Sequence, residues 1–267
     1  RDSGFKRLME SISAFRHSGN QSESVKLILY LVRLRSALTT GDREAAVNLY
    51  CLPESFSEPE DSKLLGDLYL MSARYSFAVH ETRAALDYAK RSLMIVQENG
   101  FIDLEVQVNI ELGLIMMSME RIEEGLEYFF IAQEAAKQSG RVFDYIRSWS
   151  FRGMGMFFQG NFSRCLSIID TVLPVVQKAG ARSWELYLLF MKGRVCFETG
   201  DYILAEELFQ GCLAVSQIYE PKERRDLFYK WMVRSKMYRG DFSSISILQG
   251  LENDPEALFF LSEGWYF

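Results

Sequence analysis

A turn signature that recurs every forty residues constrains this chain more than any other feature. Four of its six turns carry Gly followed by Asp or Asn, at Gly41-Asp42, Gly160-Asn161, Gly200-Asp201 and Gly240-Asp241. A glycine at such a point can adopt a positive φ and end one helix, and the following Asp or Asn can cap the next. His80 and Glu120 stand where the series expects the other two glycines. The pattern predicts helices joined by tight turns.

A second series of turns lies half a period away from the first. Gly100, Gly140 and Gly180 follow polar helix ends, and Pro221 takes the next step, where it can open a helix. Together the two series divide the whole chain into helices. We expect them at 2–17, 22–39, 43–51, 60–78, 82–97, 102–118, 121–138, 142–158, 162–178, 182–198, 202–218, 222–238, 242–251 and 255–265.

The helices have residues of fixed size at fixed distances from each turn. Seven residues before the turn the side chain is small at Ala73, Gly113, Gly153 and Gly193, and nine after it the side chain is bulky at Phe129, Ile169 and Phe209. One amphipathic helix pair cannot bury its apolar face alone, so the next pair must cover it. The spacing predicts that small residues of one helix face bulky residues of the next.

At these residues the chain resembles the tetratricopeptide repeat (TPR) family. The matching residues are Leu112-Gly113, Gly200-Asp201-Tyr202, Ala205, Phe209 and Cys212. The family repeat is usually shorter than forty residues, so the chain looks like the longer-helix subclass of kinesin light chains, Pins-type polarity proteins and the sensor solenoids of large bacterial transcription activators. The resemblance implies an all-α, right-handed superhelical solenoid of antiparallel helix pairs.

We expect one domain over residues 1–267, with a lone helix at 2–17, about six helix pairs over 22–251 and a final helix at 255–265. An array that begins with a lone second helix and ends with a lone first helix is what a piece of a longer array would contain. Such cut ends could also support self-association.

Charge and cysteine content exclude several classes of partner. The net charge of −6 disfavours nucleic acid, because phosphate binding needs clustered Lys and Arg. The apolar runs are too short to predict a membrane span. Cys51, Cys165, Cys196 and Cys212 are far apart and have no His at metal-ligand spacing, which argues against a zinc site. We expect buried free thiols in a reducing, cytoplasmic setting.

In the TPR family the first helix of each pair lines a concave groove that binds partner peptides or helices. The implied groove here is apolar in the middle and basic at its ends. Its residues are Arg74, Ile110, Leu114, Met117, Met154, Phe157, Phe158, Phe190, Arg194, Phe197, Lys230 and Arg234. One interpretation is an amphipathic helix or peptide bound there, with acidic residues meeting Arg194, Lys230 and Arg234. The other is that these side chains pack on each other as core.

The sequence contains no pattern typical of an enzyme. Only two histidines occur, His17 and His80, and neither has a nucleophile or an orienting carboxylate at useful spacing. We therefore expect no catalytic residues, no metal and no cofactor. Lys230 and Arg234 match one helix of the family's carboxylate clamp, but Ser150, Met154 and Arg194 occupy the other clamp positions. The prediction is a protein-interaction scaffold or adaptor, and the alternative is a peptide- or ligand-sensing module attached to an effector domain.

Overall fold

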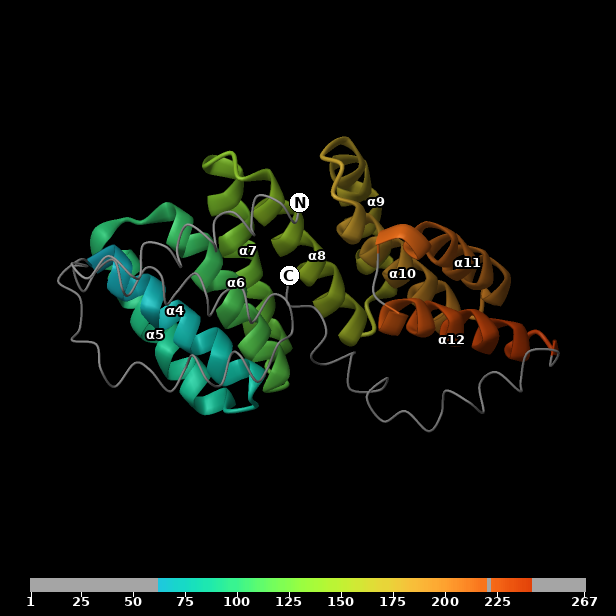
Figure 1. Cartoon of the computed structure of the whole chain (residues 1–267), viewed down its shortest axis with the longest axis horizontal. Helices are drawn as coiled ribbons and strands as arrows, with labels where there is room; N and C mark the ends of the chain where they lie inside the picture. Colours follow the sequence, from blue (N-terminus) through green and yellow to red (C-terminus); the bar gives the residue numbers. More distant parts are fainter. Residues whose placement is uncertain (1–61, 220–221, 242–267) are drawn as a thin grey trace, which may run out of the picture. The chain divides into compact units, whose positions relative to one another are not determined.

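The computed structural model of the chain describes residues 62–219 and 222–241, and within these ranges every regular element is an α-helix (Figure 1). The helices are α4 (Ser62–Ala78), α5 (Thr82–Asn99), α6 (Ile102–Ser118), α7 (Ile122–Gln138), α8 (Val142–Phe158), α9 (Phe162–Lys178), α10 (Arg182–Glu198), α11 (Tyr202–Tyr219) and α12 (Lys222–Tyr238). The nine helices predicted for this part of the chain are confirmed to within two residues at each end. Those predicted at 2–17, 22–39, 43–51, 242–251 and 255–265 lie outside the described residues.

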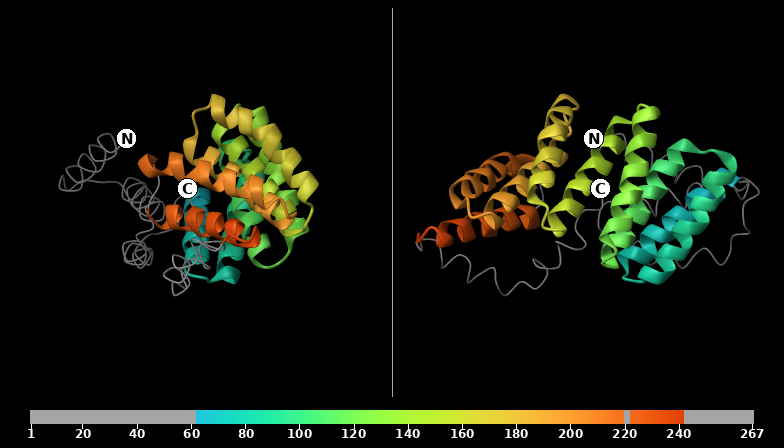
Figure 2. Two further views of the ribbon diagram at one scale, coloured as in Figure 1. Left: turned by 90° about the vertical axis from the view of Figure 1, so that its right-hand side faces the viewer. Right: turned by 180° about the vertical axis from the view of Figure 1, so that it is seen from behind.

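Helix starts recur every twenty residues, from Ser62 through Thr82 and Ile102 to Lys222. Within each unit the helices pair as antiparallel neighbours, α4 with α5 in the first and α7 through α12 in succession in the second, as α10, α11 and α12 do in amber to red in Figure 1 and again in Figure 2. The fold predicted from the turns, helix pairs joined by short connections, is thus confirmed. The residues form two compact units that divide within α6, between Glu111 and Leu112.

Each turn within the described ranges contains one residue in the left-handed region, and that residue lies where the repeat predicts glycine. Gly160, Gly200 and Gly240 have φ values of 71°, 86° and 85°. His80 and Glu120 take the same conformation, with φ of 66° and 62°, although neither is glycine. The turn geometry is therefore imposed by the helices on either side and does not require glycine.

Replacing Glu120 with glycine is expected to stabilise the chain. A side chain in the left-handed region costs about 1–2 kcal/mol. Glycine removes this strain, but it also loses more backbone entropy on folding than glutamate does, which leaves a net gain of about 0.5–1 kcal/mol in the free energy of unfolding. Urea unfolding followed by circular dichroism measures the difference. The reciprocal change, Gly160→Glu, serves as the control and should lower stability. Equal midpoints for all three proteins would contradict the strain argument.

The predicted caps are present at two of the turns. The side chains of Asn161 and Asp201 accept hydrogen bonds from the backbone N–H groups of Arg164 and Leu204, at 3.2 and 3.1 Å. These bonds satisfy donors that the first turn of a helix otherwise leaves free. The Gly-Asn and Gly-Asp pairs thus act as the sequence predicted, ending one helix and starting the next.

Two hydrophobic clusters within the second unit both include residues of α10. Its residues in the cluster formed with α8 and α9 are Tyr187, Leu188, Met191 and Val195. Its residues in the cluster formed with α11 and α12 are Leu186, Phe190 and Cys196. In contrast, α9 is buried along one stripe that includes Cys165, Ile169 and Val176. Helix α10 is therefore a central element, and α9 is an outer one.

Small residues face bulky ones across neighbouring helices, as predicted. A Cβ placed on Gly113 would overlap a ring carbon of Phe129, and one on Gly193 would lie 2.6 Å from a ring carbon of Phe209. Both rings are fully buried. The small residue seven positions before the turn thus leaves room for the aromatic residue nine positions after it.

Candidate functional site

The twelve residues predicted to line a groove differ widely in exposure. Buried are Arg74, Ile110, Phe157 and Phe190; half-buried are Leu114, Met117, Met154, Arg194, Phe197 and Lys230; exposed are Phe158 and Arg234. All of them lie on α4, α6, α8, α10 and α12, the first helices of the pairs. Only part of the predicted set is therefore open to a partner.

The position ten residues before the turn belongs to the core in α4, α6, α8 and α10, whereas in α12 it holds the half-buried Lys230. Leu70, Ile110 and Phe190 are 0% exposed there, and Ser150 is 1% exposed. The Phe190 ring lies 5.6 Å from that of Phe209 and 5.4 Å from that of Phe228. Ile110 and Phe190 therefore pack inside the protein and do not line an open surface, because a first helix is covered by neighbours on most of its sides.

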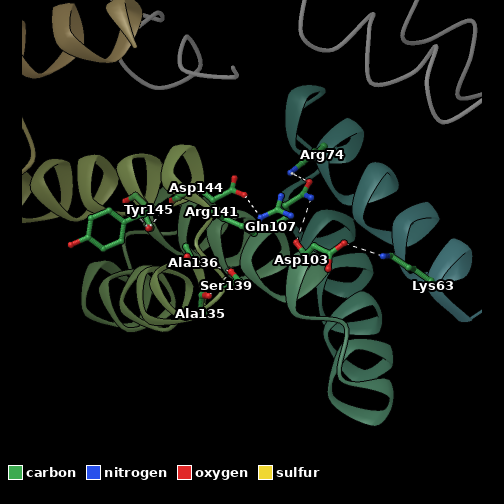
Figure 3. Close-up of polar contacts among 11 residues, drawn as sticks. Lys63, Arg74, Asp103, Gln107, Ala135, Ala136, Ser139, Arg141, Asp144 and Tyr145 are labelled. Carbon is green, nitrogen blue, oxygen red and sulfur yellow. Dashed lines mark hydrogen bonds and ion pairs between the residues drawn. The ribbon is translucent and has the colours of Figure 1, made fainter. Parts of the chain in front are cut away.

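Arg74 forms an ion pair within the first unit. Its Nε donates to Glu111 Oε2 at 3.0 Å, and its guanidinium also donates to Gln107 Oε1 at 3.5 Å (Figure 3). The side chains of Arg74 and Glu111 are 10% and 0% exposed. Arg74 therefore joins α4 to α6 as half of a buried ion pair, and its charge is not available to an acidic partner.

Arg194 and Arg234 meet at one indole ring. The Arg194 guanidinium carbon lies 3.9 Å from the centroid of Trp231 and 4.9 Å from that of Phe157. The Arg234 guanidinium carbon lies 5.3 Å from the same Trp231 centroid. Phe197 packs edge-on against Trp231 at 5.1 Å. We call Phe157, Arg194, Phe197, Trp231 and Arg234 the arginine–tryptophan cluster; it joins α8, α10 and α12.

The charge of the arginine–tryptophan cluster is only partly balanced. Glu198 lies 3.7 Å from a terminal nitrogen of Arg194, a loose pair, and the Nε of Arg194 is buried without a hydrogen-bond partner among the described residues. Burial lowers the pKa of Arg194 to about 10; Glu198 opposes this shift and the nearby charge of Arg234 adds to it. The cluster thus presents two cations that an incoming carboxylate would stabilise.

Trp231 is the residue of this cluster that sequence reasoning missed. It lies three residues before Arg234, one helical turn away, so the two share a face of α12. Arg194 and Arg234 occupy equivalent positions in successive repeats, forty residues apart. An aromatic residue one turn from one of two such arginines was therefore a usable signal.

The remaining predicted residues surround this cluster or lie apart from it. Phe158 is 52% exposed, and its ring lies 5.9 Å from that of Phe157. Met154 packs against the core cluster of α8, α9 and α10. Lys230 lies on α12, half-buried, next to Trp231 in sequence. Leu114 and Met117 lie on α6, one and four residues after Gly113.

The described cysteines are buried, and the described residues contain no candidate metal cluster. Cys165, Cys196 and Cys212 are buried free thiols, and burial raises the pKa of both Cys165 and Cys212 to about 12, which makes them unreactive. In the part of the chain that the structure describes, no group of three or more His, Cys, Asp or Glu could hold a metal ion. None of the described helices is long and apolar enough to cross a membrane. Cys51 lies outside the described residues.

Replacing Arg194 with methionine is expected to preserve stability or increase it. The charged form is disfavoured by burial, and methionine fills similar apolar space between Phe157 and Trp231 without that penalty. We expect a change between zero and a gain of about 2 kcal/mol in the free energy of unfolding. Urea unfolding checks this, with Arg164→Met on α9 as an exposed control. A loss of stability in Arg194→Met would show that the arginine stabilises the fold.

The chain is similar to TPR proteins in sequence and in fold. It is 24% identical over 189 residues to a TPR repeat-containing protein of Treponema pallidum (strain Nichols), a match that covers 69% of this chain and 22% of that protein. The chain thus spans about a fifth of the length of this relative. No known protein-family profile matches the chain.

Solved structures share its fold at low sequence identity. A signal transduction ATPase from Pyrococcus horikoshii with a TPR sensor matches 97% of this chain and 41% of that one, with a TM-score of 0.70 and 15% identity. A Rap protein complexed with competence and sporulation factor matches 90% and 67%, with a TM-score of 0.74 and 11% identity. NprR in complex with its cognate peptide NprX matches 98% and 76%, with a TM-score of 0.73 and 12% identity. The fold of the chain is that of TPR-like repeat proteins.

Proposed function

We propose that this chain is an interaction module that binds a helix or peptide of a partner protein, and that an acidic side chain of the partner is held between Arg194 and Arg234. The observation that carries the proposal is the sharing of Trp231 by two guanidinium groups, 3.9 and 5.3 Å from its centroid; among the described residues, Glu198 alone forms an ion pair with Arg194. The indole fixes both cations, so a carboxylate would meet donors that are already positioned.

An apolar contact for the same partner lies beside the cluster. Phe158 is 52% exposed at the end of α8, and Tyr238 is 63% exposed at the end of α12, where its ring lies 5.0 Å from Phe197. Exposed aromatic rings next to paired cations suit a segment with apolar and acidic side chains. The similar proteins that bind a peptide or factor, NprR and Rap, agree with this class of ligand.

Selection of peptides on the immobilised 267-residue chain tests the proposal. From a random peptide library we expect sequences that combine Asp or Glu with apolar residues. Binding of a selected peptide, measured by fluorescence anisotropy, should weaken about tenfold or more in Arg234→Glu, because one fixed cation becomes an anion. Arg164→Glu, at an exposed arginine of the outer helix α9, is the control. Selected peptides without acidic residues, or equal loss in both variants, would refute the electrostatic part.

The alternative function is a sensor module that takes a peptide or small ligand and acts on an attached effector domain. It is favoured by the likeness to the TPR sensor of the Pyrococcus ATPase and to NprR. Tight binding of a small molecule would raise the melting temperature in a thermal-shift screen. Selective stabilisation by a small molecule favours the sensor, and capture of a defined protein segment favours the scaffold. Three buried free cysteines fit the reducing, cytoplasmic setting expected for either.

A further inference from the structure

Helix α7 presents an unusual outward face. Glu123, Glu127, Phe130, Ile131 and Glu134 are spaced so that they fall within about 100° around the helix. Phe130 is 49% exposed and Ile131 is 43% exposed, and the three glutamates surround them along the helix axis. We call these five residues the α7 face. It combines an apolar centre with three negative charges.

The other outer helices provide an internal control, because the same five positions recur forty residues away. They hold Arg83, Asp87, Lys90, Arg91 and Met94 in α5, then Ser163, Ser167, Asp170, Thr171 and Pro174 in α9, then Ile203, Glu207, Gln210, Gly211 and Ala214 in α11. All fifteen of these residues are exposed. Packing within the chain therefore does not determine which residue occupies these positions. The fold alone does not explain why α7 has the adjacent apolar side chains of Phe130 and Ile131.

The Phe130 ring is held in place on the protein. The guanidinium carbon of Arg152 lies 5.3 Å from the centroid of Phe130 and 5.0 Å from that of Trp149, and Arg152 also donates a hydrogen bond to Gln133 of α7. A fixed ring loses little conformational freedom when another molecule covers it. The Phe130 ring is therefore already ordered before another molecule binds, although about half of the residue is exposed to water.

The matching face of α5 is complementary in charge. Arg83, Lys90 and Arg91 outnumber Asp87, so the face is positive, and Met94 adds an apolar side chain that is 59% exposed. We call these five residues the α5 face. Two faces of opposite charge, each with an exposed apolar centre, are suited to pack against each other between molecules.

We propose that the α7 face of one molecule docks on the α5 face of a second copy of this chain. A contact between single helices buries less area than a stable dimer needs, so the association is weak and depends on concentration. It also weakens with added salt, because exposed charges are screened. This contact uses the outer helices α5 and α7, whereas the proposed peptide site uses α8, α10 and α12. The two proposals can therefore be tested, and can fail, independently.

Sedimentation of the 267-residue chain over a range of concentrations tests the proposal. The variant Phe130→Asp/Ile131→Thr carries the two residues that α9 has at these positions. In α9, Asp170 pairs with Lys192 at 2.9 Å, so an aspartate at position 130 can pair with Arg152 in the same way. We expect the dissociation constant of the contact between copies to rise about tenfold or more. Gln210→Asp, at the equivalent position of α11, is the control and should leave it unchanged.

A charge exchange tests which faces meet. Glu127→Lys and Lys90→Glu should each weaken self-association when tested alone, because like charges then oppose each other in the contact. An equimolar mixture of the two variants should associate again, since a lysine at 127 of one chain can face a glutamate at 90 of the other. A wild-type chain that stays monomeric at every concentration overturns the proposal. So does a mixture that associates no better than its components, or a Phe130→Asp/Ile131→Thr variant that matches the wild type.

Discussion

Replacing Arg74 with methionine is expected to cost about 3–5 kcal/mol of unfolding free energy, the usual loss when one partner of a buried ion pair is removed. Glu111 Oε2 accepts from Arg74 Nε at 3.0 Å, and the Glu111 side chain is 0% exposed. Without the guanidinium, the carboxylate would remain buried after losing this ion pair. Urea unfolding followed by circular dichroism should show the midpoint fall sharply.

Two further variants separate the buried charge from loss of packing. Arg74→Met/Glu111→Met removes both charges and should recover most of the stability, because apolar side chains can replace a buried pair. Lys63→Met removes one partner of the 2.9 Å pair with Asp103, whose side chains are 48% and 51% exposed, and should cost under about 1 kcal/mol. If the double variant were as unstable as Arg74→Met, packing rather than charge would explain the loss.

The second large effect is expected at Gly193. A Cβ there would lie 2.6 Å from a ring carbon of Phe209, and the ring cannot easily move because Phe190 and Trp231 pack against it at 5.6 and 6.1 Å. Gly193→Ala should therefore destabilise the chain by about 1–3 kcal/mol through overpacking, although alanine is the better helix former. Thermal unfolding measures the drop.

Gly153 is a matched control because it occupies the same position one repeat earlier. A Cβ there meets only Ile168, at 3.4 Å, which is an ordinary contact. Gly153→Ala should therefore be neutral or gain up to about 1 kcal/mol from helix propensity. Opposite signs at the two glycines would confirm that Phe209, and not the helix itself, selects glycine at 193. A loss of equal size at both sites would disprove this.

The helices could be predicted from sequence because their signals are local. Gly200 and Asp201 specify a turn within a few residues, and the distance from Gly193 to Phe209 follows from the repeat. The same reasoning identified Arg194 and Arg234 as equivalent positions on successive first helices. Periodicity of this kind fixes which face of a helix a residue is on.

Periodicity does not reveal what lies opposite that face. Arg74 was predicted to meet a partner, but Glu111 lies across from it, 37 residues later in the chain. Ile110 and Phe190 were predicted to line a groove, but neighbouring helices cover them completely. Trp231 was not predicted to contact Arg194, because that contact depends on how closely α10 and α12 approach. Each of these contacts depends on how closely neighbouring helices approach one another. The sequence of one repeat does not specify that distance.

The position of α10 in both hydrophobic clusters affects how the second unit unfolds. Opening α10 would expose Tyr187 and Val195 on one side and Phe190 on the other, so it removes the support of α8 and α9 together with that of α11 and α12. These helices therefore form one cooperative unit and do not open pair by pair. The backbone amides of α10 should be the last in this unit to exchange with solvent deuterium.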